Sequence, residues 1–293
     1  MRIRAPAKIN LSLRVVGKRE DGYHLLDTIM LPVSLYDEIE IRKAKAKAKS
    51  AGARIKISCA HPLVPRGEQN IVFGAARLLL PRLDERLRIH IHIRKHIPVG
   101  AGLGGGSTDA AATLVGLNRL FNLGLSDAHL EKLALSLGAD VPFFIRARPA
   151  RALGIGERLF RLAGLPQIWM VIIYPGFPIS TAWVYKNLAR KLTKPRVNTS
   201  IAASLKSLDK LAGLLVNDLE SVTLDRYPRI RLFKDKLLRE GAAGGLMSGS
   251  GSAVFGIFNS KTKAQKAFHR LRNEEGVDAF LVHVLSGMIT RKA

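Results

Sequence analysis

The sequence is poor in cysteine and in long apolar runs. Cys59 is the only cysteine among 293 residues, which excludes an intrachain disulfide, a cysteine-based zinc site and a dithiol redox pair. No run approaches the roughly 20 uncharged apolar residues that a membrane helix needs, and the first residues lack the continuous apolar core of a secretory signal. These absences argue against a disulfide scaffold and a membrane protein, and they favour a cytoplasmic location.

Acidic residues are also scarce. Asp and Glu number 23 against 47 Lys and Arg, a formal net charge of +24. Such an excess attracts polyanions, so nucleic acid is the first partner to consider, although an enzyme that handles nucleotides would show it too. Part of the excess is local, because lysine alternates with alanine over 43–49. With no aromatic residue between Asp37 and His61 to stack on bases, we interpret this segment as a solvated edge strand or loop and do not expect specific nucleic-acid binding.

Apolar periodicity indicates an α+β fold. Alternation over 87–93 predicts a half-buried strand, and a continuous apolar run at 168–174 predicts a buried one. Helical spacing over 71–83 follows Asn70, an available N-cap, and recurs over 107–122, around 182–192 and over 201–215. Ser126 is expected to cap a further helix that stops at Gly138. We therefore predict two domains, 1–148 and 149–293, each a mixed or antiparallel sheet packed with helices, with the active site in the cleft between them.

The strongest chemical signal is the segment 98–109, PVGAGLGGGSTD. Five of the seven residues from Gly100 to Gly106 are glycine. Glycine lets the backbone take positive φ and approach a ligand closely. The segment runs into a helix expected to begin near Ser107, and a helix N-terminus offers unpaired N–H groups to a phosphate. The hydroxyls of Ser107 and Thr108 could bind a phosphate oxygen or Mg²⁺.

Two other glycine-loop chemistries fit less well. A Walker A loop requires a lysine after its last glycine, but Ser107 stands there. A dinucleotide fingerprint can be placed on Gly100, Gly102 and Gly105, yet the acid at the expected distance, Asp127, begins a surface helix instead of ending a strand.

With that loop, the sequence resembles the GHMP kinases. Residues 98–110 resemble their phosphate-binding motif, 5–11 (APAKINL) their N-terminal motif, and 246–252 (LMSGSGS) their C-terminal glycine motif. The resemblance implies the two-domain GHMP kinase fold, with ATP as phosphoryl donor and an alcohol as acceptor.

Four further segments, 17–24, 138–144, 154–157 and 217–220, narrow the resemblance to one GHMP family. Its enzymes phosphorylate the 2-hydroxyl of a cytidine diphosphate-linked methylerythritol in the non-mevalonate route to isoprenoid precursors. The resemblance covers about 5–258. Thr108 departs from it where a second serine is frequent, and Ser250 where threonine is frequent.

Site roles follow from the resemblance, residue by residue. Lys8 and Asp140 take the catalytic roles, Asp140 as base and Lys8 as its electrostatic partner. From the residues alone, Asp140 is expected to be a poorly solvated carboxylate among apolar neighbours, which would make it a better base; the alternative is that it caps the turn before Pro142. The resemblance places substrate contacts at Asn10, Tyr23, His24, Thr181 and Tyr185, and the glycine motif at Ser248, Gly249, Ser250 and Gly251. It places ATP binding at Pro98, Val99, Gly100, Ala101, Gly102, Leu103, Gly104, Gly105, Gly106, Ser107 and Thr108.

One metal ion is expected at the site. We expect Mg²⁺ to arrive with ATP, with Ser107 as the protein contact. His90 and His92 alternate on one strand face but lack an evident third ligand, so we interpret them as solvent-facing.

The alternative functions are a homoserine- or mevalonate-type GHMP kinase, which would not explain Tyr23 and His24, and a nucleic-acid-binding protein that has kept the kinase fold. We expect a monomer or a homodimer.

Overall fold

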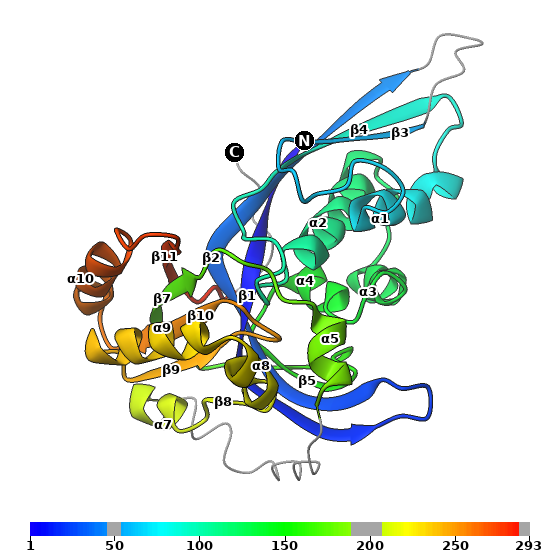
Figure 1. Ribbon diagram of the computed structural model, residues 1–293. Coiled ribbons are helices and arrows are strands. Elements are labelled where there is room, and N and C mark those ends of the chain that lie inside the picture. Colours follow the sequence, from blue (N-terminus) through cyan, green and yellow to red (C-terminus); the bar gives the residue numbers. More distant parts are fainter. Residues whose placement is uncertain (46–53, 189–206, 287–293) are drawn as a thin grey trace.

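A long hairpin forms the spine of the molecule. The computed structural model describes residues 1–45, 54–188 and 207–286, so the lysines beyond 45 and parts of the helices expected at 182–192 and 201–215 lie outside the described residues. Strands β1 (Arg2–Lys18) and β2 (His24–Lys45) pair antiparallel along almost their whole length (Figure 1). The turn between them contains Gly22, whose φ of +89° suits glycine.

The hairpin is the centre of a larger, mixed sheet of seven strands among the described residues, with the order β3-β4-β2-β1-β8. Strand β4 (Leu87–Arg94) pairs antiparallel with the far end of β2, and β3 (Ile55–Cys59) runs parallel to β4. The two-residue strand β8 (Val216–Asn217) lies parallel to β1. Strands β5 (Ala150–Gly154) and β6 (Arg158–Arg161) extend the sheet from the near end of β2.

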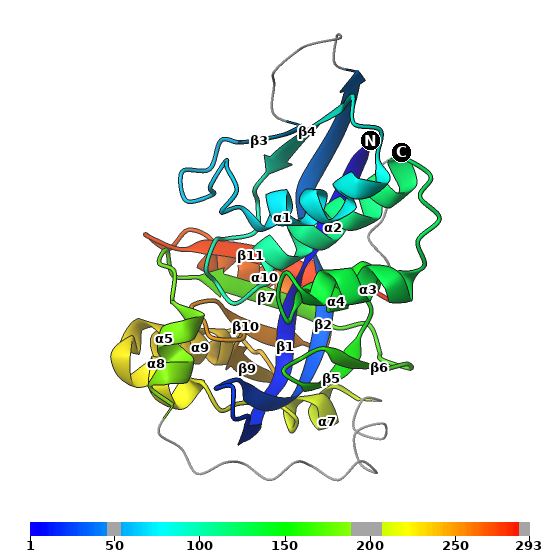
Figure 2. The same cartoon turned by 90° about the vertical axis from the view of Figure 1, so that its right-hand side faces the viewer.

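Helices cover one side of this sheet (Figure 2). They are α1 (Ile71–Leu79), the short 3₁₀ helix η1 (Leu80–Arg82), α2 (Gly105–Leu120), α3 (Asp127–Leu135) and α4 (Val141–Arg146). Asn70 caps α1 through its side-chain oxygen, as the sequence predicts. Pro81 changes the expected single helix over 71–83 into α1 and η1, because proline cannot continue the α-helical ladder. Apolar side chains of the sheet and of these helices form one continuous core.

A second, smaller sheet packs on the hairpin. Its order is β11-β7-β10-β9, with every pairing antiparallel, and its strands are β7 (Trp169–Tyr174), β9 (Gly244–Met247), β10 (Val254–Phe258) and β11 (Asp278–His283). Met170 and Ile172 of β7 face the hairpin, whereas Val171 and Ile173 face a further core beneath helices α9 (Pro228–Arg239) and α10 (Lys261–Leu271). The run 168–174 is continuously apolar because β7 is buried on both faces.

The remaining helices are α5 (Thr181–Lys186), α7 (Leu208–Ala212) and α8 (Glu220–Arg226). The predicted fold class is confirmed: the structure is α+β, with one mixed and one antiparallel sheet. Strands β5 and β6, which follow residue 148, belong to the larger sheet, and the smaller sheet begins at Trp169. The domain boundary at 148 stays a prediction. Within the described residues, no helix combines the length and the apolar character that crossing a membrane requires.

Candidate active site

A cleft of about 800 Å³ opens where the two sheets and their helices meet. Its walls come from β1, the glycine-rich loop before α2, the start of α4, helix α5 and the turn between β9 and β10. Most of the predicted site residues line it, including both proposed catalytic residues and the five proposed substrate contacts. The structure thus gathers into one cavity residues that the sequence separates by up to 242 positions, from Lys8 to Ser250.

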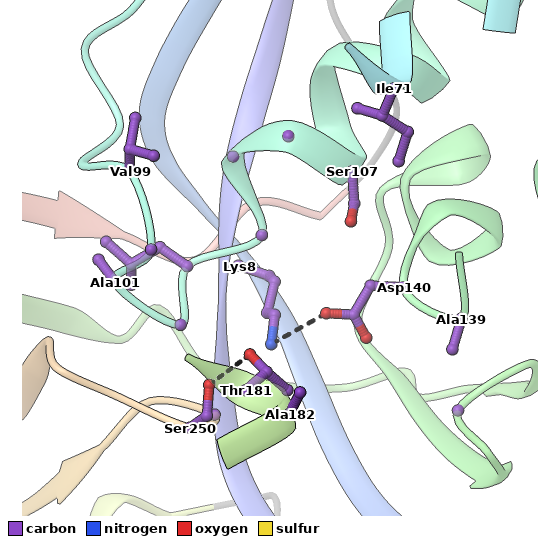
Figure 3. Close-up of a pocket in the computed structure, with 18 of the residues that line it drawn as sticks. Lys8, Ile71, Val99, Ala101, Ser107, Ala139, Asp140, Thr181, Ala182 and Ser250 are labelled. Carbon is purple, nitrogen blue, oxygen red and sulfur yellow. Dashed lines mark hydrogen bonds and ion pairs between the residues drawn. The ribbon is translucent and has the colours of Figure 1, made fainter. Parts of the chain in front are cut away.

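A lysine and a carboxylate face each other in this cleft (Figure 3). Nζ of Lys8 lies 3.3 Å from Oδ2 of Asp140; the lysine side chain is 5% exposed and the aspartate 38%. Asp140 occupies the N-cap position of α4, yet its side chain makes no capping hydrogen bond, so helix capping does not account for it. We expected a poorly solvated carboxylate from its apolar neighbours; instead it remains partly exposed because it faces the cleft.

Hydrogen bonds fix the ammonium group of Lys8. Its Nζ donates to Oδ1 of Asn10 at 2.6 Å, and Nδ2 of Asn10 donates to Oγ1 of Thr28 at 2.8 Å. The Thr28 hydroxyl in turn donates to the backbone oxygen of Ser12. All four residues belong to the hairpin and are at most 9% exposed, so the lysine is held in one orientation by a buried polar chain.

The glycine-rich loop is hydrogen-bonded to the backbone of Lys8. The Lys8 N–H donates to the backbone oxygen of Leu103 at 2.9 Å. Gly102 and Gly104 adopt φ of +76° and +73°, and a Cβ on Gly102 would lie 2.0 Å from the backbone oxygen of Ser248. The glycines therefore serve close packing between chain segments as well as the backbone conformation.

Helix α2 begins at Gly105, two residues earlier than expected, because Gly104 provides the left-handed N-cap. The whole predicted loop from Pro98 to Ser107 lines the cleft, and Figure 3 shows the Ser107 hydroxyl facing the space above Lys8 and Asp140. The first N–H groups of α2 lack intrahelical partners by helix geometry, which makes this end a favourable position for an anion. Thr108 differs: it is fully buried and is absent from the cleft lining, so its hydroxyl points into the fold.

The second glycine turn, 248–251, packs against the glycine-rich loop that precedes α2. Oγ of Ser248 donates to the backbone oxygen of Gly102 at 3.0 Å, and the N–H of Ala253 donates to the backbone oxygen of Ala101. Gly249 and Ser250 line the cleft, whereas Ser248 and Gly251 do not. The hydroxyls of Ser250 and Thr181 lie 2.8 Å apart (Figure 3), which ties α5 to the turn.

An aromatic pair occupies another part of the cleft. The rings of His24 and Tyr185 stack with centroids 5.1 Å apart and planes 26° apart, and Tyr23 beside them is 59% exposed. Burial, with the charge of Lys18, lowers the pKa of His24. Burial, with the nearby charge of Asp140, raises the pKa of Tyr185. A neutral imidazole and a neutral phenol therefore present a flat, polar-edged surface to the cleft.

Comparisons with known proteins agree with this geometry. The model of the GHMP kinases N terminal domain matches residues 70–148, and the model of the GHMP kinases C terminal matches residues 199–278. The 4-diphosphocytidyl-2-C-methyl-D-erythritol kinase of Citrifermentans bemidjiense is 48% identical over 285 residues, covering 97% of this chain and 99% of that protein.

The chain belongs to the 4-diphosphocytidyl-2-C-methyl-D-erythritol kinase family.

Solved structures support the same assignment. A crystal structure of 4-(cytidine 5'-diphospho)-2C-methyl-D-erythritol kinase is 34% identical, with a TM-score of 0.81, and the match covers 98% of this chain and 100% of that one. A homoserine kinase from Cytophaga hutchinsonii shares the fold at 19% identity and a TM-score of 0.74, covering 99% and 95%. The protein is therefore a GHMP kinase that uses ATP, as the sequence motifs predicted.

Sequence reasoning missed a buried charged cluster beside the glycine-rich loop. Nζ of Lys95 forms ion pairs with the carboxylates of Asp37 and Asp109, the latter at 2.9 Å, and all three side chains are at most 4% exposed. Burial, together with the charge of Asp37, raises the pKa of Asp109 well above its ordinary value. Lys95 and Asp109 line the cleft. The sequence signal was Asp109 itself, a carboxylate at position 5 of an alanine-rich helix that turned out to be buried.

The segment 217–220, part of the resemblance to this kinase family, has a structural role that the sequence did not reveal. Nδ2 of Asn217 donates to the backbone oxygens of Met247 and Gly249, at 2.9 and 2.7 Å. Oδ2 of Asp218 accepts from the N–H of Val15, and Oε1 of Glu220 accepts from the N–H of Met247. This segment therefore fastens the second glycine turn to β1.

The donor set fits a magnesium ion that arrives with nucleotide. Among the described residues, no group of three or more His, Cys, Asp or Glu side chains could hold a metal by itself. Mg²⁺ at nucleotide sites is bound mainly by phosphates and water, with one or two protein ligands that are usually carboxylates. The Ser107 hydroxyl, at the start of α2 and on the cleft wall, is the oxygen that would contact such an ion.

Proposed function

We propose that this protein transfers the terminal phosphoryl group of ATP to the 2-hydroxyl of 4-diphosphocytidyl-2-C-methyl-D-erythritol, with Asp140 as base and Lys8 as its electrostatic partner. The observation that carries the chemistry is the 3.3 Å pair of a buried lysine and a cleft-facing carboxylate below the N-terminus of α2. The identity of the substrate is inferred from the substrate named for the similar kinases and from the aromatic pair of His24 and Tyr185.

Each group has a defined task in this proposal. The carboxylate of Asp140 accepts the proton that leaves the attacking hydroxyl. The ammonium of Lys8, oriented by Asn10, stabilises the charge that develops on the reacting oxygen. The N–H groups at the start of α2 bind the transferring phosphate, and the Ser107 hydroxyl contacts Mg²⁺, which neutralises phosphate charge when bound.

The acceptor is held at the other end of the cleft. The rings of Tyr23, His24 and Tyr185 provide a surface on which a base can stack, and base stacking on aromatic side chains is worth about 1–3 kcal/mol. The neutral imidazole of His24 can donate one hydrogen bond and accept another, which suits the mixed donor and acceptor edge of cytosine. Thr181 and Asn10 offer a hydroxyl and an amide to the methylerythritol unit.

The test is a coupled ADP-release assay with Mg-ATP and four acceptors: 4-diphosphocytidyl-2-C-methyl-D-erythritol, homoserine, mevalonate and galactose. We expect turnover of the cytidyl acceptor alone. Turnover of homoserine or mevalonate instead would keep the kinase and overturn the substrate. A folded protein that turned over none of the four acceptors would contradict the proposal.

A cytoplasmic location and a monomeric or dimeric state stay predictions.

A further inference from the structure

One half of the larger sheet has a face that the catalytic site does not use. Strands β3 and β4, the end of β2 and the start of β1 bury their odd-numbered side chains, such as Ile39, Ile41 and Ile91, against α1 and α2. Since side chains alternate along a strand, the even-numbered ones point to the opposite side. These are half-buried or exposed. None of them lines the cleft.

This opposite side is strongly cationic, and we call it the basic sheet face. Its cationic side chains are Arg2, Arg4, Arg42, Lys56, Arg88 and Arg94. The strand register arranges the face in cross-strand rows. Arg42 of β2 lies opposite His90 of β4, which lies opposite Lys56 of β3, and one row further Glu40 lies opposite both Arg2 and His92.

Carboxylates neutralise only part of this charge. Glu38 and Glu40 are the acidic residues of the face, and they pair with Arg94, Arg2 and Arg42 at 3.5, 3.6 and 2.8 Å. The hydrogen bond from Arg42, with the charges of the surrounding arginines, holds the pKa of Glu40 below its ordinary value. Two carboxylates against six cations leave the face with a net positive charge.

Two histidines, His90 and His92, lie at the centre of this face. Oγ of Ser58 lies 2.9 Å from Nε2 of His90 and 2.8 Å from Nδ1 of His92. Burial, with the positive charges of Lys56 and Arg42 among its neighbours, lowers the pKa of His90. The Ser58 hydroxyl thus bridges the two rings, which are half-buried polar groups among the cations.

We propose that the basic sheet face binds the phosphate backbone of nucleic acid without sequence preference. A row of arginine and lysine side chains on a fixed scaffold is the arrangement that neutralises successive phosphates and releases their counterions. The net charge of +24 supplies the long-range attraction. An anionic membrane is the less suitable partner because such surfaces also need apolar anchors. The large apolar side chains that the described part of the chain exposes, Leu232 and Leu238 of α9 among them, lie on other elements.

The experiment measures fluorescence anisotropy of a labelled 20-base-pair duplex DNA, titrated with the full chain at several salt concentrations. We expect binding at low salt whose logarithmic affinity falls linearly with the logarithm of salt concentration. The double variant Arg42→Glu/Lys56→Glu should weaken binding at least about tenfold and lower the salt slope by about 2, since each lost phosphate contact removes about 0.9. A single-stranded RNA of equal length shows which nucleic acid is preferred.

A matched control carries the same change of charge elsewhere. Arg231→Glu/Lys266→Glu alters two exposed cations on α9 and α10, and we expect it to change affinity less than about threefold. Both double variants should keep the kinase activity of the wild type, because neither touches the cleft; retained activity also shows that they fold. Equal losses in the two variants, an affinity that does not depend on salt, or binding to anionic phospholipid vesicles but not to nucleic acid would each overturn the proposal.

Discussion

The two sides of the cleft differ in chemistry. The side built from the first 140 residues carries the lysine, histidine and aspartate side chains of the cleft: Lys8, His24, Lys95, Asp109 and Asp140. Among the described residues that line the cleft from Ile155 onward, none is Lys, Arg, Asp, Glu or His; that side offers the hydroxyls of Thr181 and Ser250 and the ring of Tyr185. In the proposed mechanism, the first side handles the proton and the phosphate, and both sides hold the acceptor, through His24 on the first and Tyr185 on the second.

The largest effect should come from removing the base on the charged side. Asp140→Asn should lower kcat by about a thousandfold, within the range of general base catalysis, while the affinity for ATP stays within twofold. Steady-state kinetics and isothermal titration with ATP measure the two quantities. Asp127→Asn, on the surface of α3, serves as a control with unchanged kcat. Substantial activity in Asp140→Asn would exclude that residue as the base.

The contact between the two sides can be broken at Gly102. A methyl group there meets the backbone oxygen of Ser248 at 2.0 Å and forces an alanine into φ of +76°, so Gly102→Ala should lower the free energy of unfolding by about 3 kcal/mol. Gly124→Ala, at φ of +67° with no atom near its Cβ, should lose only about 1 kcal/mol. Urea denaturation of both variants measures the difference, and equal losses would show that the packing against Ser248 is unimportant.

The uncharged side can be tested at Tyr185. Tyr185→Leu should raise the KM for the cytidyl acceptor about tenfold, since one stacking contact with a base is lost, and should leave the KM for ATP within twofold. Tyr185→Phe keeps the ring and should behave like the wild type. An unchanged acceptor KM in Tyr185→Leu would place the base elsewhere in the cleft.

The smallest effect concerns pH. Burial and the charge of Lys18 lower the pKa of His24 from its ordinary value of 6.5. Its imidazole is therefore neutral at pH 7 and gains a proton only at a pH below 6.5. Protonation removes the lone pair that accepts a hydrogen bond. The acceptor KM should therefore be constant above pH 7 and rise a few fold as pH falls through the lowered pKa. His24→Gln should abolish this dependence, and Lys18→Met should move it to higher pH; a dependence that persisted in His24→Gln would belong to another group.

Local features of the fold could be predicted from the sequence. The alternation of Ile89, Ile91 and Ile93 specified a strand with one buried face, and this is how β4 is buried. Asn70 and Ser126 were identified as N-caps, and both accept hydrogen bonds from the helices that they start. Each of these features depends on residues within one turn or one strand.

Features that depend on distant partners were less predictable. The hydroxyl of Thr108 was expected at the ligand but is buried, because the start of α2 at Gly105 turns that position toward the core. Lys95 and Asp37 carry no motif, and only the pairing of β2 with β4 brings them together. The glycine pattern also gave no sign that Gly102 packs against Ser248.

The sequence by itself determined the glycine-rich loop that is proposed to bind phosphate, because glycine density and a following helix are local properties of the chain. It also determined the family, through motifs that stand in order along 5–258. Only the tertiary structure decided that Lys8 reaches Asp140, that one side of the cleft carries the charges, and that the even-numbered cations of four strands share one face. These depend on strand pairing between residues far apart in the chain, and periodicity within a single strand does not specify which strand will be its neighbour.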